Sequence, residues 1–198
     1  MTLHQYLREA TKGAHRELDH HPLLASLVHD GLTREHYGNA LAGLYGVYDP
    51  LEAQLYALIQ QKGLDFSHAG RFRLPALRAD LAALGRSPIT TAISFPPATA
   101  VPQLVGMLYT LEGSAMGGQA IARYIVSQQS STSGARLPTR FFSGDGEAGS
   151  ERWQAFWTFA DASCRQDDFE AAASAAVELF RKIKHQLDAA QLVLYGAE

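Results

Sequence analysis

The sequence predicts an all-α protein, built as one multi-helical domain. Apolar residues recur at spacings of three and four through most of its 198 residues, and the alternation typical of β-strands is almost absent. We find no internal repeat. A chain of this length suits a single domain over residues 1–198, and a hydrophobic content of 46% supports a sizeable core.

The first helix is marked by its cap and by one apolar stripe. Thr2 followed three residues later by Gln5 has the pattern of a capping box. The stripe ends before His21-Pro22, and its members are Leu3, Leu7, Ala10, Ala14 and Leu18. Because these positions repeat with the helical period, we expect them to be buried together.

Three further helices follow in the middle of the chain. Thr33 starts a long stripe that reaches Leu58, and Pro50 within it predicts a kink because its ring displaces the carbonyl one turn back. A shorter helix is expected over Leu74–Leu84. After a proline-rich loop, helix resumes from about Val101 to Val126.

The last third of the chain begins with a predicted connection and ends with two helices. Residues 127–149 are rich in Ser, Gly and Gln, which predicts a long surface connection. Ser150 then caps a helix with an aromatic run at helical spacing, which predicts core packing: Trp153, Phe156, Trp157 and Phe159. Asp167 caps the final helix.

Composition excludes several functional classes. Lys and Arg total 17 against 20 Asp and Glu, and this balance argues against a broad nucleic-acid or anionic-membrane surface. The single cysteine, Cys164, excludes an internal disulfide and an all-cysteine metal site. The start of the sequence has no apolar signal core, and four prolines interrupt the uncharged stretch 87–111. We therefore expect a cytoplasmic protein without a membrane span.

One candidate site lies on the first helix. His15 is one turn from Thr11 and Asp19 and two turns from Arg8, so the four share a helical face. An imidazole held through one nitrogen, with cations nearby, suits a metal ligand that binds an anionic cofactor; Asp19 or a backbone carbonyl could hold it. The alternative is a surface histidine among solvated charges.

A second candidate site lies on the helix that begins near Val101. Three glycines stand in a strong helical pattern, where each costs about 1 kcal/mol relative to alanine: Gly113, Gly117 and Gly118. Gly113 and Gly117 fall on one face, with Gly106 two turns earlier. This stripe suits a flat ligand lying against the backbone, or close packing of a second helix that Gly43 and Gly46 could supply.

Taken together, the segments LREATKGAH (7–15) and GSAMGG (113–118) resemble the heme oxygenase family. The resemblance implies a heme sandwiched between a proximal helix and a kinked, glycine-rich distal helix. By this resemblance His15 is the axial iron ligand, and Arg8 and also Lys12 are expected to pair with the heme propionates. Thr11 and Asp19 are expected to bind the cofactor as well. Tyr109 resembles a propionate-contacting tyrosine one turn before the first distal glycine.

The same resemblance assigns catalytic roles to Gly113, Ser114 and Gly117, and cofactor contact to Gly118. Many family members carry an aspartate immediately after the first distal glycine, where it orders the water network that steers oxygen activation. Ser114 stands at that position, and a hydroxyl cannot hold a negative charge at neutral pH. Some bacterial members share the Glu-Gly-Ser sequence found here.

The implied activity is cleavage of heme at a meso carbon, dependent on oxygen and reductant, to biliverdin, carbon monoxide and ferrous iron. Heme is then both cofactor and substrate, a ferredoxin or a flavoprotein reductase is the expected electron donor, and a bilin-binding photoreceptor is a possible product acceptor. One alternative is a non-catalytic heme-binding or heme-sensing protein of the same fold. Another is a related helical fold that acts on a thiamin-type small molecule through Cys164.

Overall fold

Helices account for all regular structure in the part of the chain that the computed structural model describes, residues 1–67, 70–95, 97–129, 136–144 and 146–196. The all-α prediction is confirmed. The α-helices are α1 (Leu3–Asp19), α2 (Pro22–Ala25), α3 (Arg34–Lys62), α4 (Leu74–Leu84), α5 (Val101–Gln129), α6 (Arg140–Ser143), α7 (Gly149–Ser163) and α8 (Phe169–Tyr195). Short 3-10 turns at Ser26–Val28, Gly146–Ala148 and Gln166–Asp168 link some of them.

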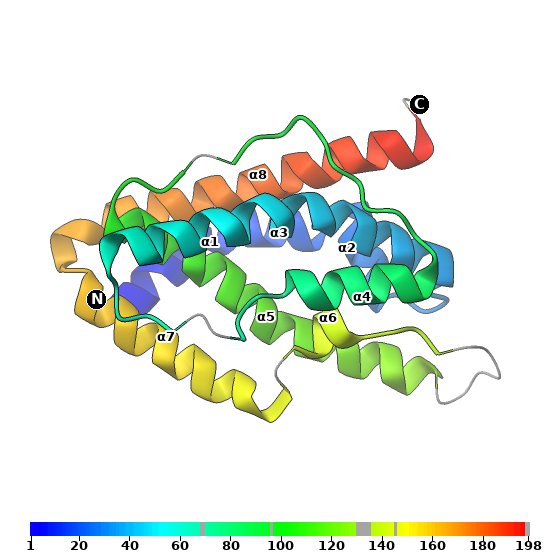
Figure 1. Cartoon of the computed structure of the whole chain (residues 1–198), viewed down its shortest axis with the longest axis horizontal. Coiled ribbons are helices and arrows are strands. Elements are labelled where there is room, and N and C mark those ends of the chain that lie inside the picture. Colours follow the sequence, from blue (N-terminus) through cyan, green and yellow to red (C-terminus); the bar gives the residue numbers. More distant parts are fainter. Residues whose placement is uncertain (68–69, 96, 130–135, 145, 197–198) are drawn as a thin grey trace.

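The long helices α3, α5 and α8 form the body of the molecule (Figure 1). In this view α3 crosses the front, α1 runs behind it, and α5 and α8 start together at the left and diverge toward the right. Both α1 and α5 pack against α8, and α7 and α6 pack against α5. The buried apolar side chains of these helices form one continuous cluster.

The expected caps of α1 and the bounds of α4 are confirmed. The Gln5 backbone N–H donates to Thr2 Oγ1 at 3.2 Å, and the Thr2 N–H donates to Gln5 Oε1 at 3.0 Å, which completes the capping box. The first turn of α4 is capped from another helix. Glu52 of α3 accepts the backbone N–H of Arg73 at 2.6 Å and of Leu74 at 3.1 Å.

The buried stripe of α1 differs from the prediction, because Ala10 is exposed and Ala14 and Leu18 are only half-buried. Leu3 and Leu7 are buried as expected, but Thr11 is buried in place of Ala10, which is exposed. Thr11 can enter the core because its hydroxyl donates to the Leu7 carbonyl at 2.7 Å and so keeps a hydrogen bond. The stripe therefore runs along positions 3, 7 and 11.

The predicted surface connection over residues 127–149 is partly wrong. Helix α5 continues to Gln129, and α6 buries Phe141 and Phe142, which are 3% and 5% exposed. Phe141 meets the ring of Tyr48 edge-on at 5.0 Å, so this segment contributes to the core. Residues 130–135 and 145, which belong to the same predicted connection, lie outside the described residues.

The starts of α7 and α8 differ from the predicted caps, and Pro50 lies inside α3. Helix α7 starts at Gly149, so Ser150 is inside it, and Asp168 rather than Asp167 precedes α8 because a 3-10 turn comes first. Pro50 lies within α3, which continues as one helix on both sides of it. Among the described residues, no helix is both long enough and apolar enough to cross a membrane.

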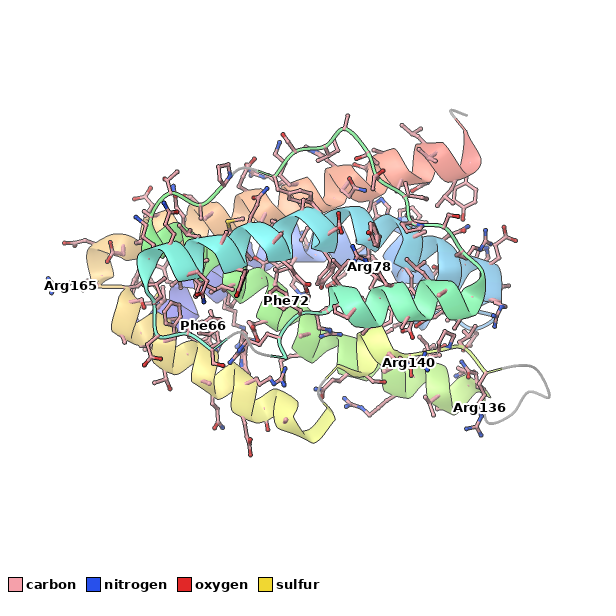
Figure 2. All side chains as sticks on the ribbon, viewed as in Figure 1. Phe66, Phe72, Arg78, Arg136, Arg140 and Arg165 are labelled. Atoms are coloured by element: carbon pink, nitrogen blue, oxygen red, sulfur yellow. The ribbon has the colours of Figure 1, made fainter. Side chains whose placement is uncertain are left out.

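The loop between α3 and α4 ties these helices to α5 and α7. Figure 2 labels Phe66 and Phe72 on this loop, and the Phe66 ring lies 4.7 Å from that of Phe159 on α7. Arg71 forms an ion pair with Glu112 of α5, with Nη1 2.7 Å from Oε2. Glu112 therefore faces neighbouring elements, away from the side of α5 that carries Gly117.

Candidate functional site

His15 lies on the exposed side of α1, with 59% of its side chain accessible. Its Nδ1 lies 2.8 Å from Asp19 Oδ2, so of the two proposed neighbours the structure shows the carboxylate. The pairing is an i,i+4 contact along one helix face, and it makes Nε2 the nitrogen that can bind a metal. The imidazole also packs beside Phe180 of α8, with ring centroids 5.4 Å apart.

The other predicted residues of α1 divide into two groups. Arg8 and Lys12 are exposed, as a role in binding an anion requires. Thr11 is 2% exposed, and its hydroxyl is bonded to the Leu7 carbonyl. The prediction that Thr11 shares the cofactor-binding face is therefore corrected: it points into the core of the protein.

The glycines of α5 have different surroundings, and two of them serve close packing. A Cβ added at Gly106 would overlap the Ala172 carbonyl of α8. A Cβ at Gly118 would lie 3.2 Å from the Phe142 carbonyl oxygen, so Gly118 faces α6 rather than the predicted cofactor. At these two positions glycine is explained by a neighbouring backbone.

Gly113 and Gly117 face open space instead. Among the described residues outside its own stretch of helix, a Cβ at Gly117 would meet no atom within 4 Å, and a Cβ at Gly113 would meet only the tip of Trp153, at 3.9 Å. Gly43 and Gly46, the expected partners in the packing alternative, lie against Leu187 and Gln186 of α8. That packing alternative is therefore wrong for Gly113 and Gly117, whose side of α5 is open.

Ser114 lies on the same side of α5 and completes what we call the open face: Gly113, Ser114 and Gly117. The Ser114 Oγ lies 2.8 Å from the hydroxyl oxygen of Tyr48 on α3 and donates to the Leu111 carbonyl at 2.7 Å. Tyr48 is buried, and burial raises its pKa, so the phenol keeps its proton at neutral pH.

Tyr109 stands one turn before Gly113 in a group that we call the aromatic cluster: His4, Tyr109, Trp153, Phe156 and Trp157. The Tyr109 ring lies 6.0 Å from Trp153 and 5.8 Å from Trp157, and His4 of α1 lies 4.5 Å from Trp157. The cluster thus connects α1, α5 and α7. The core prediction for the aromatic run is confirmed in full only for Phe156, which is completely buried, whereas Trp153, Trp157 and Phe159 are half-buried against the core.

The structure brings the two predicted segments to a common neighbour, α8. Helix α5 packs on α8 at Gly106, and His15 of α1 lies against Phe180 of α8. Trp153 and Phe180 were missed as site residues, because helical spacing identifies a side chain as apolar but does not show which neighbour it meets. An exposed imidazole, nearby cations and an open glycine backbone together suit an anionic, planar ligand that carries a metal.

Comparison with known sequences gives a family match over most of the chain. A sequence model of the family described as "Heme oxygenase" matches residues 1–187. A curated protein named "Heme oxygenase" from Xanthomonas campestris pv. campestris (strain 8004) is 48% identical over 59 residues. The matching segment covers 30% of this chain and 34% of that protein, about a third of its length.

Comparison with solved structures shows the same fold. The NO- and CO-bound heme oxygenase of Neisseria meningitidis superposes with a TM-score of 0.76 at 20% identity, covering 96% of this chain and 92% of that chain. The heme oxygenase of Leptospira interrogans gives 0.69 at 17% identity, covering 96% and 100%. A heme complex of heme oxygenase-1 from the cyanobacterium Synechocystis gives 0.69 at 17% identity, covering 96% and 92%.

Proposed function

The chain belongs to the heme oxygenase family, and from that premise we propose that it binds heme between His15 and the open face of α5 and cleaves it. The products would be biliverdin, carbon monoxide and ferrous iron. The observation that carries the proposal is the open backbone at Gly117, where a Cβ would meet nothing within 4 Å in the part of the chain that the structure describes. Glycine there costs helix stability without a packing reason, which a ligand at the backbone would supply.

The residues on the α1 side fit heme. Asp19 holds Nδ1 of His15 and fixes the ring, so that Nε2 would be left to bind the heme iron. Arg8 and Lys12 are exposed cations on the same helix, and they would neutralise the propionates. When bound, heme supplies the iron that activates oxygen and the ring that is oxidised.

The residues on the α5 side fit the other face of the ring. Gly113 and Gly117 would allow the backbone to approach the macrocycle without an intervening side chain. Ser114, held by Tyr48 and Leu111, lies on this face and can order a water molecule there. Tyr109, from the aromatic cluster, is proposed to contact a propionate.

The proposal extends to partners. Electrons are needed from outside the chain, and we propose a ferredoxin or a flavoprotein reductase as their source and the cytoplasm as the location of the reaction. A bilin-binding photoreceptor is proposed as one acceptor of the product. These assignments rest on the family and on the chemistry of the reaction.

A second candidate function is heme binding without turnover, and the observation that favours it is the uncharged Ser114. One experiment separates the two. The protein is loaded with ferric heme and then given oxygen with a reductase and its electron source. Loss of the Soret band with the appearance of bilin absorbance supports the enzyme. A stable ferrous–oxygen complex supports the binding protein, and failure to bind heme refutes both.

A further inference from the structure

We propose that Trp153 determines which edge of the heme is cleaved, because its indole closes one end of the open face of α5. The inference rests on the proposed function and adds to it a residue of α7. The sequence pattern assigns Trp153 to the core, and neither the family resemblance nor the glycine motif points to it.

Among the described residues, a neighbouring helix comes close to the open face at Gly113 and not at Gly117. Gly113 and Gly117 are one turn apart, which is about 6 Å along a helix axis. Trp153 Cη2 lies 3.9 Å from the position of a Cβ on Gly113, whereas nothing lies within 4 Å of that position on Gly117. A flat ligand can therefore spread past Gly117 but meets the edge of an indole at Gly113.

The Trp153 indole is held on several sides by the aromatic cluster. It stacks on Phe156 with centroids 5.4 Å apart and an interplanar angle of 22°, and it meets Trp157 edge-on at 5.3 Å and 81°. Tyr109 lies 6.0 Å away on α5, and Phe156 is completely buried. Turning the indole out of this position would disturb a packed core, so it acts as a fixed wall.

A fixed wall at this place has a chemical consequence. The meso carbons of heme are alike in intrinsic reactivity, and rotation of the ring in its own plane exchanges their positions relative to the protein. Cations on α1 would attract the propionate edge, and Trp153 would limit how far the ring can rotate or slide toward Gly113. The choice among meso carbons then depends on a contact that takes no part in the reaction itself.

The test compares two tryptophans of the same helix. Trp153→Ala removes the wall, and Trp153→Phe shortens it while keeping a ring in the cluster. Trp157→Phe is the matched control, because Trp157 belongs to the same cluster but does not come within 4 Å of the Cβ position on Gly113. After turnover with oxygen and a reductase, the biliverdin isomers are separated by chromatography and quantified.

We expect Trp153→Ala to change the isomer ratio by about tenfold or more, the scale on which a missing apolar contact alters selectivity. Trp153→Phe should change it in the same direction by less, and Trp157→Phe should keep the wild-type ratio. An unchanged ratio in both Trp153 variants would overturn the inference and leave the proposed function intact. Absence of bilin from the wild-type protein would overturn the proposed function instead.

A second measurement does not depend on turnover. The proton NMR spectrum of the ferric, cyanide-bound heme protein contains shifted heme methyl signals whose pattern reports the orientation of the ring about the iron–histidine axis. We expect a new or additional pattern in Trp153→Phe and the wild-type pattern in Trp157→Phe. The wild-type pattern in both variants would contradict the role of Trp153, and this readout remains available if Trp153→Ala fails to fold.

Discussion

The hydroxyl oxygen of Tyr48 lies 2.8 Å from Oγ of Ser114, which joins α3 to the open face of α5. Ser114 has one hydroxyl proton and donates it to the Leu111 carbonyl, so Tyr48 is the donor in this contact. Ser114 then presents an acceptor toward the open side of the helix. An ionised carboxylate also only accepts hydrogen bonds, so under the proposed function Ser114 would keep that part of the role that the resemblance gives to an aspartate at this position.

Replacing Tyr48 by Phe removes this donor and keeps the packing against Phe141. We expect the free energy of unfolding to fall by about 1 kcal/mol and bilin formation to slow about fivefold, the same energy expressed as a rate. Tyr45→Phe is the control, since Tyr45 also loses a hydrogen bond, to Asp49, on the same helix. Urea unfolding and single-turnover absorbance measure the two effects; equal turnover in both variants would refute the role of Tyr48.

Replacing Gly117 by Ala should change the stability of the protein and its affinity for heme in opposite directions. The added methyl group meets no atom within 4 Å, so the heme-free protein should gain up to about 1 kcal/mol of stability. Heme affinity should fall, because the methyl group occupies the surface on which the ring would lie. Gly106→Ala is expected to do the opposite and destabilise the fold against Ala172. Thermal unfolding and heme titration check both, and unchanged heme affinity in Gly117→Ala would count against the open face as the site.

Replacing Asp19 by Ala removes the group that holds His15. Loss of such a partner typically lowers metal affinity or activity by about 10- to 100-fold, and we expect a heme affinity reduced to this extent. The pair is on the surface, so the unfolding temperature should change little. Glu17→Ala, on the same helix, is the control. His15→Ala should abolish the spectrum of histidine-ligated ferric heme, and its persistence would show that another residue is the ligand.

His21 makes stability depend on pH. Its Nδ1 accepts the Leu23 N–H at 3.2 Å as the cap of α2, and burial lowers its pKa below the ordinary value of 6.5 despite Asp188 nearby. The unfolded chain therefore binds a proton at a higher pH than the folded protein does. The contribution of His21 to the free energy of unfolding is therefore fully present above pH 6.5 and falls as the pH drops below that value.

The check compares urea unfolding at about pH 7.5 and about pH 5.5. His21→Asn keeps an oxygen that can cap α2 but does not titrate, so it should lose less stability between the two values than the wild type. The exposed His29 is the control position, and His29→Asn should behave like the wild type. An equal loss in His21→Asn and wild type would show that His21 is not responsible.

Cys164 is expected to be unreactive in the folded protein. It is 7% exposed, and burial raises its pKa to about 11, with Asp168 and Asp161 adding to the shift. At about pH 8 only about one thiol in a thousand is then ionised. Reaction with a chromogenic disulfide should be slow in buffer and fast in urea. Fast reaction in buffer would revive the alternative in which Cys164 is a nucleophile.

Local sequence patterns predicted most of the fold. The capping box of Thr2 and Gln5 depends on residues three positions apart, and the structure has it. The bounds of α4 also follow the local pattern, although Glu52 of α3 caps its first turn. The errors arise where a particular contact, rather than apolar spacing, determines which side chain is buried. Thr11 is buried because its hydroxyl finds the Leu7 carbonyl, and Phe141 is buried because Tyr48 of another helix lies beside it.

The candidate site was predictable in its composition but not in its geometry. The motif around His15 and the glycines of α5 could be recognised from the sequence, and spacing alone placed Asp19 next to His15. Spacing could not show that Gly118 faces α6 while Gly117 faces open space, because both are equally unusual in a helix. The position of Trp153 depends on how α7 packs on α5, which no local pattern encodes.

The carboxylate of Glu52 couples the stability of the start of α4 to the packing of α4 against α3. It lies 21 residues before Arg73 and accepts two backbone donors that α4 cannot satisfy by itself. The first turn of α4 is therefore complete only when α4 packs against α3. Any separation of the two helices exposes both backbone N–H donors at once. Amide hydrogen exchange at the start of α4 will consequently follow opening of the helix pair, not fraying of a single end.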